Sequence, residues 1–226
     1  MKRPVIGMLG ALAALAVLAA WAVAGSRDRL GPRPEAERPA LALVTSLPLV
    51  FGEEFGLDNG GSPALTRLEQ RYKVVPIGVA DERSLRGQRL LLMAHPRAQP
   101  AEVLVQLDKW VRGGGKLLLL ADPKLDWPSN RPIGDRLRPQ PAFADTGLLA
   151  HWGLKLSGPE AWSADTSGHL ASSGDCIVVG AGMVARCPIG HGWAVVIADA
   201  DFLNVEDSEA DNLALLVGEL NRLESR

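Results

Sequence analysis

The stretch RLLLMAHPRAQPAEVLVQLDKWVRGGGKLLLLADP, residues 89–123, decides the fold class. Residues 89–94 and 116–121 are almost entirely apolar, which is typical of strands buried on both faces of a parallel sheet. Between them, residues 100–112 place apolar side chains at helical spacing, and the glycines at 113–115 end that helix. A strand, a helix and a strand in this order predict a parallel βαβ unit.

The flanking sequence extends this alternation in both directions. Residues 40–45 and 73–77 are expected to be strands, and between them Ser62 and Pro63 form a good helix start. A short helix is expected around 146–152, a strand at 192–198 and an amphipathic helix from about 208 to 223. We therefore predict one α/β domain over residues 40–226, with a mostly parallel, flavodoxin-like sheet covered by helices and a C-terminal β-hairpin.

The predicted hairpin carries the two cysteines of the chain, Cys176 and Cys187. A two-residue loop at Ala181-Gly182 would set Cys176 directly opposite Cys187, where a disulfide is within reach. In an oxidising compartment we expect that bridge. Two buried free thiols, or a register that separates the cysteines, are the alternatives.

The N-terminus is the other decisive segment. Val5 to Ala24 is an unbroken run of twenty apolar or small residues, long enough to cross a bilayer as a helix. We expect residues 1–24 to be a retained anchor in the inner (cytoplasmic) membrane, 25–39 a Pro-rich linker, and the domain to lie in the periplasm. A signal peptide cleaved after Ala24, which would release a secreted binder, is the alternative. A net charge of −2, with no basic run beyond the N-terminus, argues against nucleic-acid binding.

Two segments resemble a known family: residues 90–94 with 110–123, and residues 190–204 with Asp211-Asn212. They are similar to the extracytoplasmic auxiliary domain of gliding-motility-type ABC transport systems, within the class I glutamine-amidotransferase-like group of flavodoxin-like folds. The resemblance implies a non-catalytic, membrane-associated domain near a transporter. Members of that family often carry several membrane spans or a C-terminal one, whereas this chain has a single N-terminal candidate.

The residues that an amidotransferase-type enzyme needs are missing. Such an enzyme places a nucleophilic Cys on a sharp elbow after a buried strand, but here the strand at 89–94 is followed by His95-Pro96. The pattern Gly180-x-Gly182-x-x-Ala185 matches a dinucleotide fingerprint, yet Pro188 follows too soon for the helix that this fingerprint must open. We expect no catalytic residue and no cofactor.

Candidate ligand-binding residues stand where predicted strands end. Asp199 and Asp201 follow the strand at 192–198, Asp122 follows 116–121, and His95 follows 89–94. Paired carboxylates at such an edge can bind a cation or perform acid–base chemistry. A structural role is favoured, in which Asp199 and Asp201 cap the next turn and Asp122 fixes the exit of its strand. No metal site is expected, because the histidines lack metal-ligand spacing and no third ligand stands near Asp199 and Asp201 in the sequence.

The long loop at 122–142 carries a cluster of arginines between Arg131 and Arg138, which is either a solvated loop or a partner-docking loop. Taken together, the sequence predicts a membrane-anchored, non-enzymatic periplasmic domain that binds a protein partner, such as a transporter or envelope component. The alternative is a hydrolase or ligand-binding enzyme in which Asp199, Asp201 and His95 converge on one pocket.

Overall fold

A computed structural model describes residues 31–52, 61–159, 168–205 and 213–226. The predicted anchor, Val5 to Ala24, and the Asp211-Asn212 pair lie outside these described residues. Within them, no helix combines the length and the apolar character that crossing a membrane requires.

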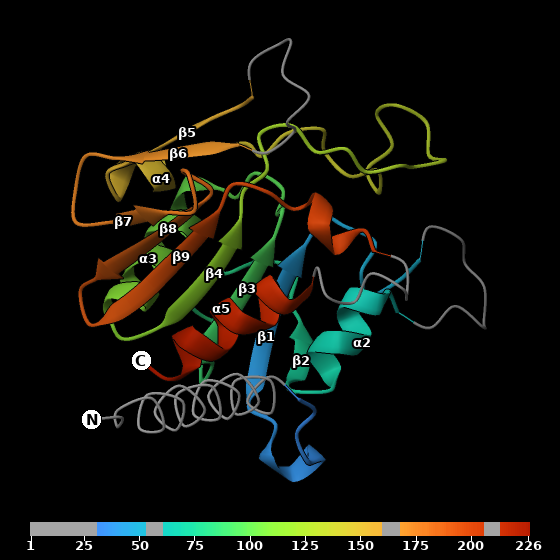
Figure 1. Ribbon diagram of the computed structural model, residues 1–226, viewed down its shortest axis with the longest axis horizontal. Coiled ribbons are helices and arrows are strands. Elements are labelled where there is room, and N and C mark those ends of the chain that lie inside the picture. The colour runs from blue at the N-terminus through green and yellow to red at the C-terminus, as the bar shows by residue number, and fades with distance from the viewer. Residues whose placement is uncertain (1–30, 53–60, 160–167, 206–212) are drawn as a thin grey trace, which may run out of the picture.

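A seven-stranded sheet forms the centre of the molecule, with strand order β2-β1-β3-β4-β9-β8-β7 (Figure 1). Strands β2, β1, β3, β4 and β9 run parallel, and β8 and β7 are antiparallel to their neighbours. The predicted α/β class, the mostly parallel sheet and the antiparallel C-terminal strands are thereby confirmed. The strands are β1 (Ala40–Thr45), β2 (Lys73–Pro76), β3 (Leu90–Ala94), β4 (Lys116–Leu120), β7 (Ile177–Val179), β8 (Val184–Ile189) and β9 (Gly192–Ile197).

Helices cover both faces of this sheet. Helices α2 (Pro63–Glu69) and α5 (Ala214–Glu224) pack on one face, while α3 (Ala101–Arg112) and α4 (Leu148–His151) pack on the other. All five residues of β3 are buried, as are the four leucines of β4, because each face of these central strands lies beneath a helix layer. Two short 3₁₀ helices, η1 (Glu35–Glu37) and η2 (Asp201–Leu203), complete the helical elements of the described residues.

A second, two-stranded antiparallel sheet pairs β5 (Leu154–Ser157) with β6 (His169–Ser172). No sequence pattern predicted this second sheet. Both strands are four residues long and half exposed, so neither shows the continuous apolar run that identifies the central strands. The pair lies beyond α4, at the end of the molecule that carries β7 (Figure 1).

The segment before β1 packs against the domain. Arg33 makes a two-pronged ion pair with Glu224 of α5, at 3.0 and 2.9 Å, and its backbone N–H donates to the Gln70 carbonyl. Residues 31–39, the described part of the predicted linker, are therefore fixed to the domain, with Arg33 as their contact to the C-terminal helix. This leaves 25–30 as the predicted linker residues about which the structure says nothing.

The predicted hairpin forms with the predicted register. Ile177 pairs with Arg186 and Val179 with Val184, so Cys176 falls opposite Cys187. The two loop residues, Ala181 and Gly182, both have positive φ, the geometry of the tight turn that suits a right-twisted hairpin. The glycine-rich segment is thus followed by strand β8 and not by the helix that a dinucleotide site would need.

A disulfide joins Cys176 to Cys187, with a Cα–Cα distance of 4.2 Å. It ties β7 at the sheet edge to β8, and it shortens the unfolded chain by closing a loop of 11 residues' separation. We expect removal of the bridge to lower the free energy of unfolding by about 2–3 kcal/mol, because the unfolded chain regains that loop entropy. Urea unfolding of the Cys176→Ala/Cys187→Ala variant measures this loss. Reductant should lower the urea midpoint of the wild type and leave that of the variant unchanged. Equal urea midpoints for the wild type and the variant, each with and without reductant, would contradict the prediction.

Candidate functional site

A strained turn follows β3. His95 has φ +45° and is fully buried, whereas non-glycine residues seldom adopt positive φ. Its backbone N–H donates to the Leu120 carbonyl at 3.0 Å, which holds the turn against the end of β4. A positive φ directly after a buried strand is also a feature of the nucleophile elbow, on which hydrolytic enzymes of α/β type present a Ser or Cys. In that elbow a helix follows at once, whereas here α3 begins at Ala101. The residue that follows, Pro96, has no N–H to offer an oxyanion.

The imidazole of His95 has a structural contact. Its Nε2 lies 2.9 Å from the Gln140 carbonyl oxygen, so Nε2 carries the proton and donates. Burial lowers the pKa of His95, which keeps the ring neutral with Nδ1 as an unprotonated acceptor. His95 therefore anchors the loop between β4 and α4, residues 122–147, to the sheet edge.

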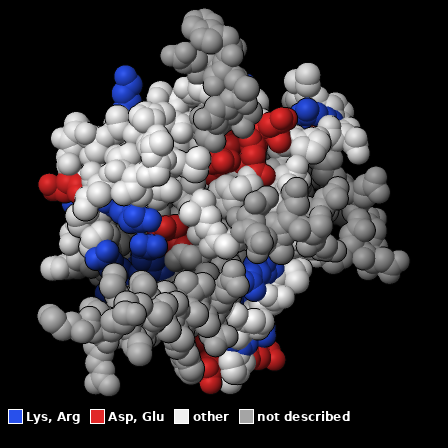
Figure 2. Space-filling view, in the orientation of Figure 1, with Lys and Arg blue, Asp and Glu red and all other residues white. Residues whose placement is uncertain are grey.

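Three carboxylates meet at the ends of β4 and β9. Asp122 follows β4, Asp199 and Asp201 follow β9, and one carboxylate oxygen of each lies within 4.8 Å of the others. Figure 2 shows acidic side chains gathered at this edge of the molecule, beside η2. The sequence analysis singled out all three residues but did not place Asp122 beside the pair, because its approach depends on β4 and β9 being neighbours.

Each of these carboxylates accepts hydrogen bonds from backbone N–H groups. Asp122 accepts from Ala200 N at 2.9 Å and from Lys124 N at 2.8 Å, which joins the exit of β4 to the exit of β9. Asp199 accepts from Asp201 N, and Asp201 accepts from Asp126 N, each at 2.8 Å. These contacts fit the structural role, in which short acidic side chains cap turns. The same three aspartates also have the spacing of a cation site.

The proximity of the acids changes their ionisation. Burial raises the pKa of Asp122 above its usual range. Burial, and then the negative charge of Asp122, raises the pKa of Asp201 to about 6. Ionisation of Asp201 is therefore less favourable in the folded protein than in the unfolded chain, although the carboxylate form still predominates at pH 7.

We expect Asp201→Asn to stabilise the domain at about pH 8 and to have no effect at about pH 4. A pKa raised from 3.8 to about 6 means that Asp201 favours folding below pH 3.8 and loses that contribution as the pH rises through 6. The gain at high pH should be about 1 kcal/mol, after allowance for solvent screening of this partly exposed side chain. Asparagine keeps the acceptor for Asp126 N, so only the charge is removed. Urea unfolding at both pH values tests the prediction, and a gain that persists at the lower pH would contradict it.

His95 does not join the carboxylate cluster. The cluster found among the described residues contains the three aspartates, and the ring of His95 bonds to Gln140 instead. The structure thus brings together Asp122, Asp199 and Asp201 and gives His95 a separate role in positioning the loop.

The loop at 122–147 is folded by arginine side chains that donate to backbone carbonyls. Arg97, just after the elbow, donates to the carbonyl oxygens of Arg136 and Arg138, in the latter case at 3.0 Å. Arg138 in turn donates to the carbonyls of Ser129 and Arg131. The arginines of the loop were expected from the sequence but Arg97 was not, and its position directly after His95-Pro96 was the available signal.

Comparisons with known proteins support the fold. No protein-family model matches the chain, and no curated protein does. Among solved structures, the N-terminal domain of mmIFT52 superposes with a TM-score of 0.54 at 16% identity, covering 83% of this chain and 98% of that one. The exo-β-1,4-mannosidase Op5Man5 from Opitutaceae bacterium strain TAV5 gives 0.44 at 12% identity, covering 83% of this chain and 36% of the mannosidase.

A β-galactosidase from Bacillus circulans sp. alkalophilus gives a TM-score of 0.36 at 14% identity, covering 83% of this chain and 32% of the galactosidase. This chain therefore spans about a third of each glycosidase. The likeness to the mmIFT52 domain supports the α/β fold. At 16% identity it speaks for the fold alone.

Proposed function

We propose that this protein is a membrane-anchored, non-enzymatic domain of the periplasm that acts through a protein partner, as an auxiliary component of an ABC-type transport system. The observation that carries the proposal is the elbow after β3. The residue after the strand has the positive φ of a nucleophile-bearing turn, but it is a buried, neutral His95 followed by Pro96. A scaffold with this elbow and no nucleophile on it is suited to binding and not to acyl transfer.

The loop at 122–147 offers the surface for that partner. Ile133 is 94% exposed and Leu137 is 57% exposed, although the loop is fixed to the domain through His95 and Arg97. Large apolar side chains held in water on an ordered loop are typical of a contact surface. The ABC-type assignment and the membrane anchor rest on the family resemblance and on the apolar run at Val5 to Ala24.

Site-specific photo-crosslinking in intact membranes tests this proposal. A photoreactive residue at Ile133 should give an adduct that mass spectrometry identifies as a membrane-transport component. The matched control is the same residue at Val105, which is 68% exposed on α3, a different surface. Adducts to the same protein from both positions, or none from Ile133, would contradict a partner surface on the loop.

Sequencing the mature N-terminus tests the anchor separately. A chain that retains Val5 to Ala24 and resists alkaline extraction from membranes agrees with the proposal. A mature chain that begins after Ala24 and is recovered in the soluble fraction would overturn it.

A second candidate function rests on the carboxylate cluster. Three converging acids, one with a pKa of about 6, favour a ligand-binding or hydrolytic site at Asp199 and Asp201. Titration with CaCl₂, MgCl₂ or MnCl₂ separates the candidates, since a bound cation would raise the melting temperature of the wild type but not that of Asp199→Asn. The structural role of these acids predicts equal melting temperatures with and without each cation.

A further inference from the structure

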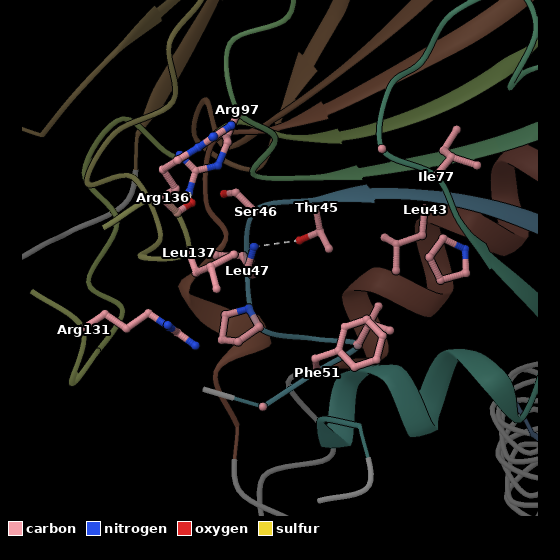
Figure 3. A pocket seen from close by; sticks show the side chains of 15 residues that line it. Leu43, Thr45, Ser46, Leu47, Phe51, Ile77, Arg97, Arg131, Arg136 and Leu137 are labelled. Atoms are coloured by element: carbon pink, nitrogen blue, oxygen red, sulfur yellow. Dashed lines mark hydrogen bonds between the residues drawn. The ribbon is translucent and has the colours of Figure 1, made fainter. Parts of the chain in front are cut away.

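A pocket of about 430 Å³ opens at the carboxyl ends of β1 and β2, where no sequence feature pointed to a cavity (Figure 3). In the strand order, β2 lies on one side of β1, whereas β3 and then β4 lie on its other side. The direction in which successive strands are added therefore reverses between β1 and β3. Open α/β sheets bind their ligands at such a reversal of strand order, outside the carboxyl ends of the strands. The volume falls in the range of small-molecule sites.

The charged groups gather on one side of the pocket, where Leu47 and Leu137 lie among them, and the opposite side is apolar. Figure 3 shows Arg97 and Arg136 together on one side, with Leu43, Ile77 and Phe51 on the other. Arg131 also lines the charged side and pairs with Asp135 at 3.8 Å. The lining residues that the structure describes include no Asp or Glu.

Among the described residues, no acid neutralises the positive charge of Arg97 or Arg136. Arg97 donates to the carbonyl oxygens of Arg136 and Arg138, which orient its guanidinium without cancelling its charge. Arg136 is exposed. Over the described ranges, no carboxylate forms an ion pair with either arginine.

Hydrogen bonds hold the pocket open as a formed site. The hydroxyl of Thr45 donates to the Ala94 carbonyl at 2.9 Å and accepts from Leu47 N at 2.9 Å. The hydroxyl of Ser46 donates to the His95 carbonyl at 2.5 Å. The loop after β1 is thereby fixed to the elbow, and the arginine loop is fixed to the same elbow through His95. A site built on anchored elements loses little entropy on binding.

We infer that this pocket binds a small amphipathic anion, with its carboxylate or phosphate group at Arg97 and Arg136 and its apolar body against Leu43, Ile77 and Phe51. Guanidinium groups form strong charge-assisted hydrogen bonds with such head groups, and the opposite side gains from covering apolar surface. The occupant is a free small molecule, because the pocket is of small-ligand size. This site goes beyond the proposed function, since it takes a small molecule and not a protein, although Leu137 of the loop borders both the pocket and the proposed partner surface.

Isothermal titration of the full-length chain in a neutral detergent, with octanoate as the probe and a micelle blank subtracted, tests the inference. Octanoate and octyl phosphate should bind, while acetate, which lacks the apolar body, and octylammonium, which reverses the charge, should bind at least about tenfold more weakly. Added salt should weaken the binding of octanoate. Equal binding of octanoate and octylammonium would overturn the inference.

Two arginine variants supply the matched control. Arg136→Gln should weaken octanoate binding about fivefold to tenfold, and it leaves the backbone carbonyl that receives Arg97 intact. Arg83→Gln removes the same charge from an exposed position outside the pocket and should leave affinity unchanged. On the apolar side, Phe51→Ala should weaken octanoate and leave acetate unaffected, and its 77% exposure makes misfolding of the variant no concern. Equal affinities in Arg136→Gln and Arg83→Gln, or no binding of octanoate by the wild type, would refute the site.

Discussion

Replacing Gly192 by Ala is expected to destabilise the domain by about 3 kcal/mol or more, through overpacking against the main chain. Gly192 begins β9 where this strand passes the end of α3, and an added Cβ would overlap the carbonyl oxygens of Val111 and Gly115. Both obstacles are backbone atoms. They are fixed from either side, because His191 N donates to Arg112 O at 2.9 Å and Trp193 N donates to Gly115 O at 3.2 Å. The overlap can therefore be relieved only if the C-terminal end of α3 moves away from β9.

Gly218→Ala is the matched control for this substitution. Gly218 lies within α5, and an added Cβ there meets no atom within 4 Å. Alanine should stabilise the helix by about 1 kcal/mol, because it restricts the unfolded backbone. Urea unfolding followed by circular dichroism should thus move the two midpoints in opposite directions. Similar midpoints for both variants would show that β9 and α3 can separate at little cost, contrary to the prediction.

The second large effect concerns the ion pair between β8 and α5. Glu219 is 3% exposed on α5, and Arg186 of β8 contacts it through two nitrogens, at 2.5 and 3.1 Å. Arg222 remains as a more distant cation, at 3.7 Å. Arg186→Met keeps most of the aliphatic stem but leaves a buried carboxylate with weak compensation. We expect a loss of about 3 kcal/mol, equivalent to a melting temperature lower by roughly 6–12 °C.

Two further variants isolate the cause of that loss. Arg186→Met/Glu219→Leu removes both charges and should recover most of the stability, since no buried charge then lacks a partner. Arg112→Met breaks the more exposed pair with Asp108 and should cost no more than about 1 kcal/mol. A double variant as unstable as Arg186→Met would indicate that lost packing, and not an uncompensated charge, causes the effect.

The parts of the fold that the sequence predicts are those with strong local patterns. The central strands β3 and β4 and the helix α3 agree within a residue or two with the predicted ranges, because continuous burial and helical spacing are both written along the chain. The hairpin register also follows from local chemistry, since the tight turn at Ala181 and Gly182 sets which residues face each other. Strands β5 and β6 were missed because short, half-exposed strands have no comparable signal.

The candidate site was predicted only in part, for a related reason. Asp199 and Asp201 could be identified because they follow a buried strand, whereas the approach of Asp122 required knowing that β4 and β9 are neighbours. The separate role of His95 depends on its contact with Gln140, far along the chain. The pocket beside β1 could not be predicted from the sequence, because its walls come from separate parts of the chain. Its apolar side comes from β1, β2 and the segments that follow them, and its charged side from Arg97 and the loop at 122–147.

By itself the amino-acid sequence determined the α/β class, the order of its principal strands and helices, the pairing of the two cysteine positions and the absence of a nucleophile after β3. These properties depend on residues within a few positions of one another, where spacing and turn chemistry act directly. The meeting of three aspartates, the anchoring of the arginine loop by His95 and Arg97, and the amphipathic pocket were decided only by tertiary structure. Parallel strands bring residues from distant parts of the chain to one sheet edge, and which strands become neighbours depends on packing over the whole domain.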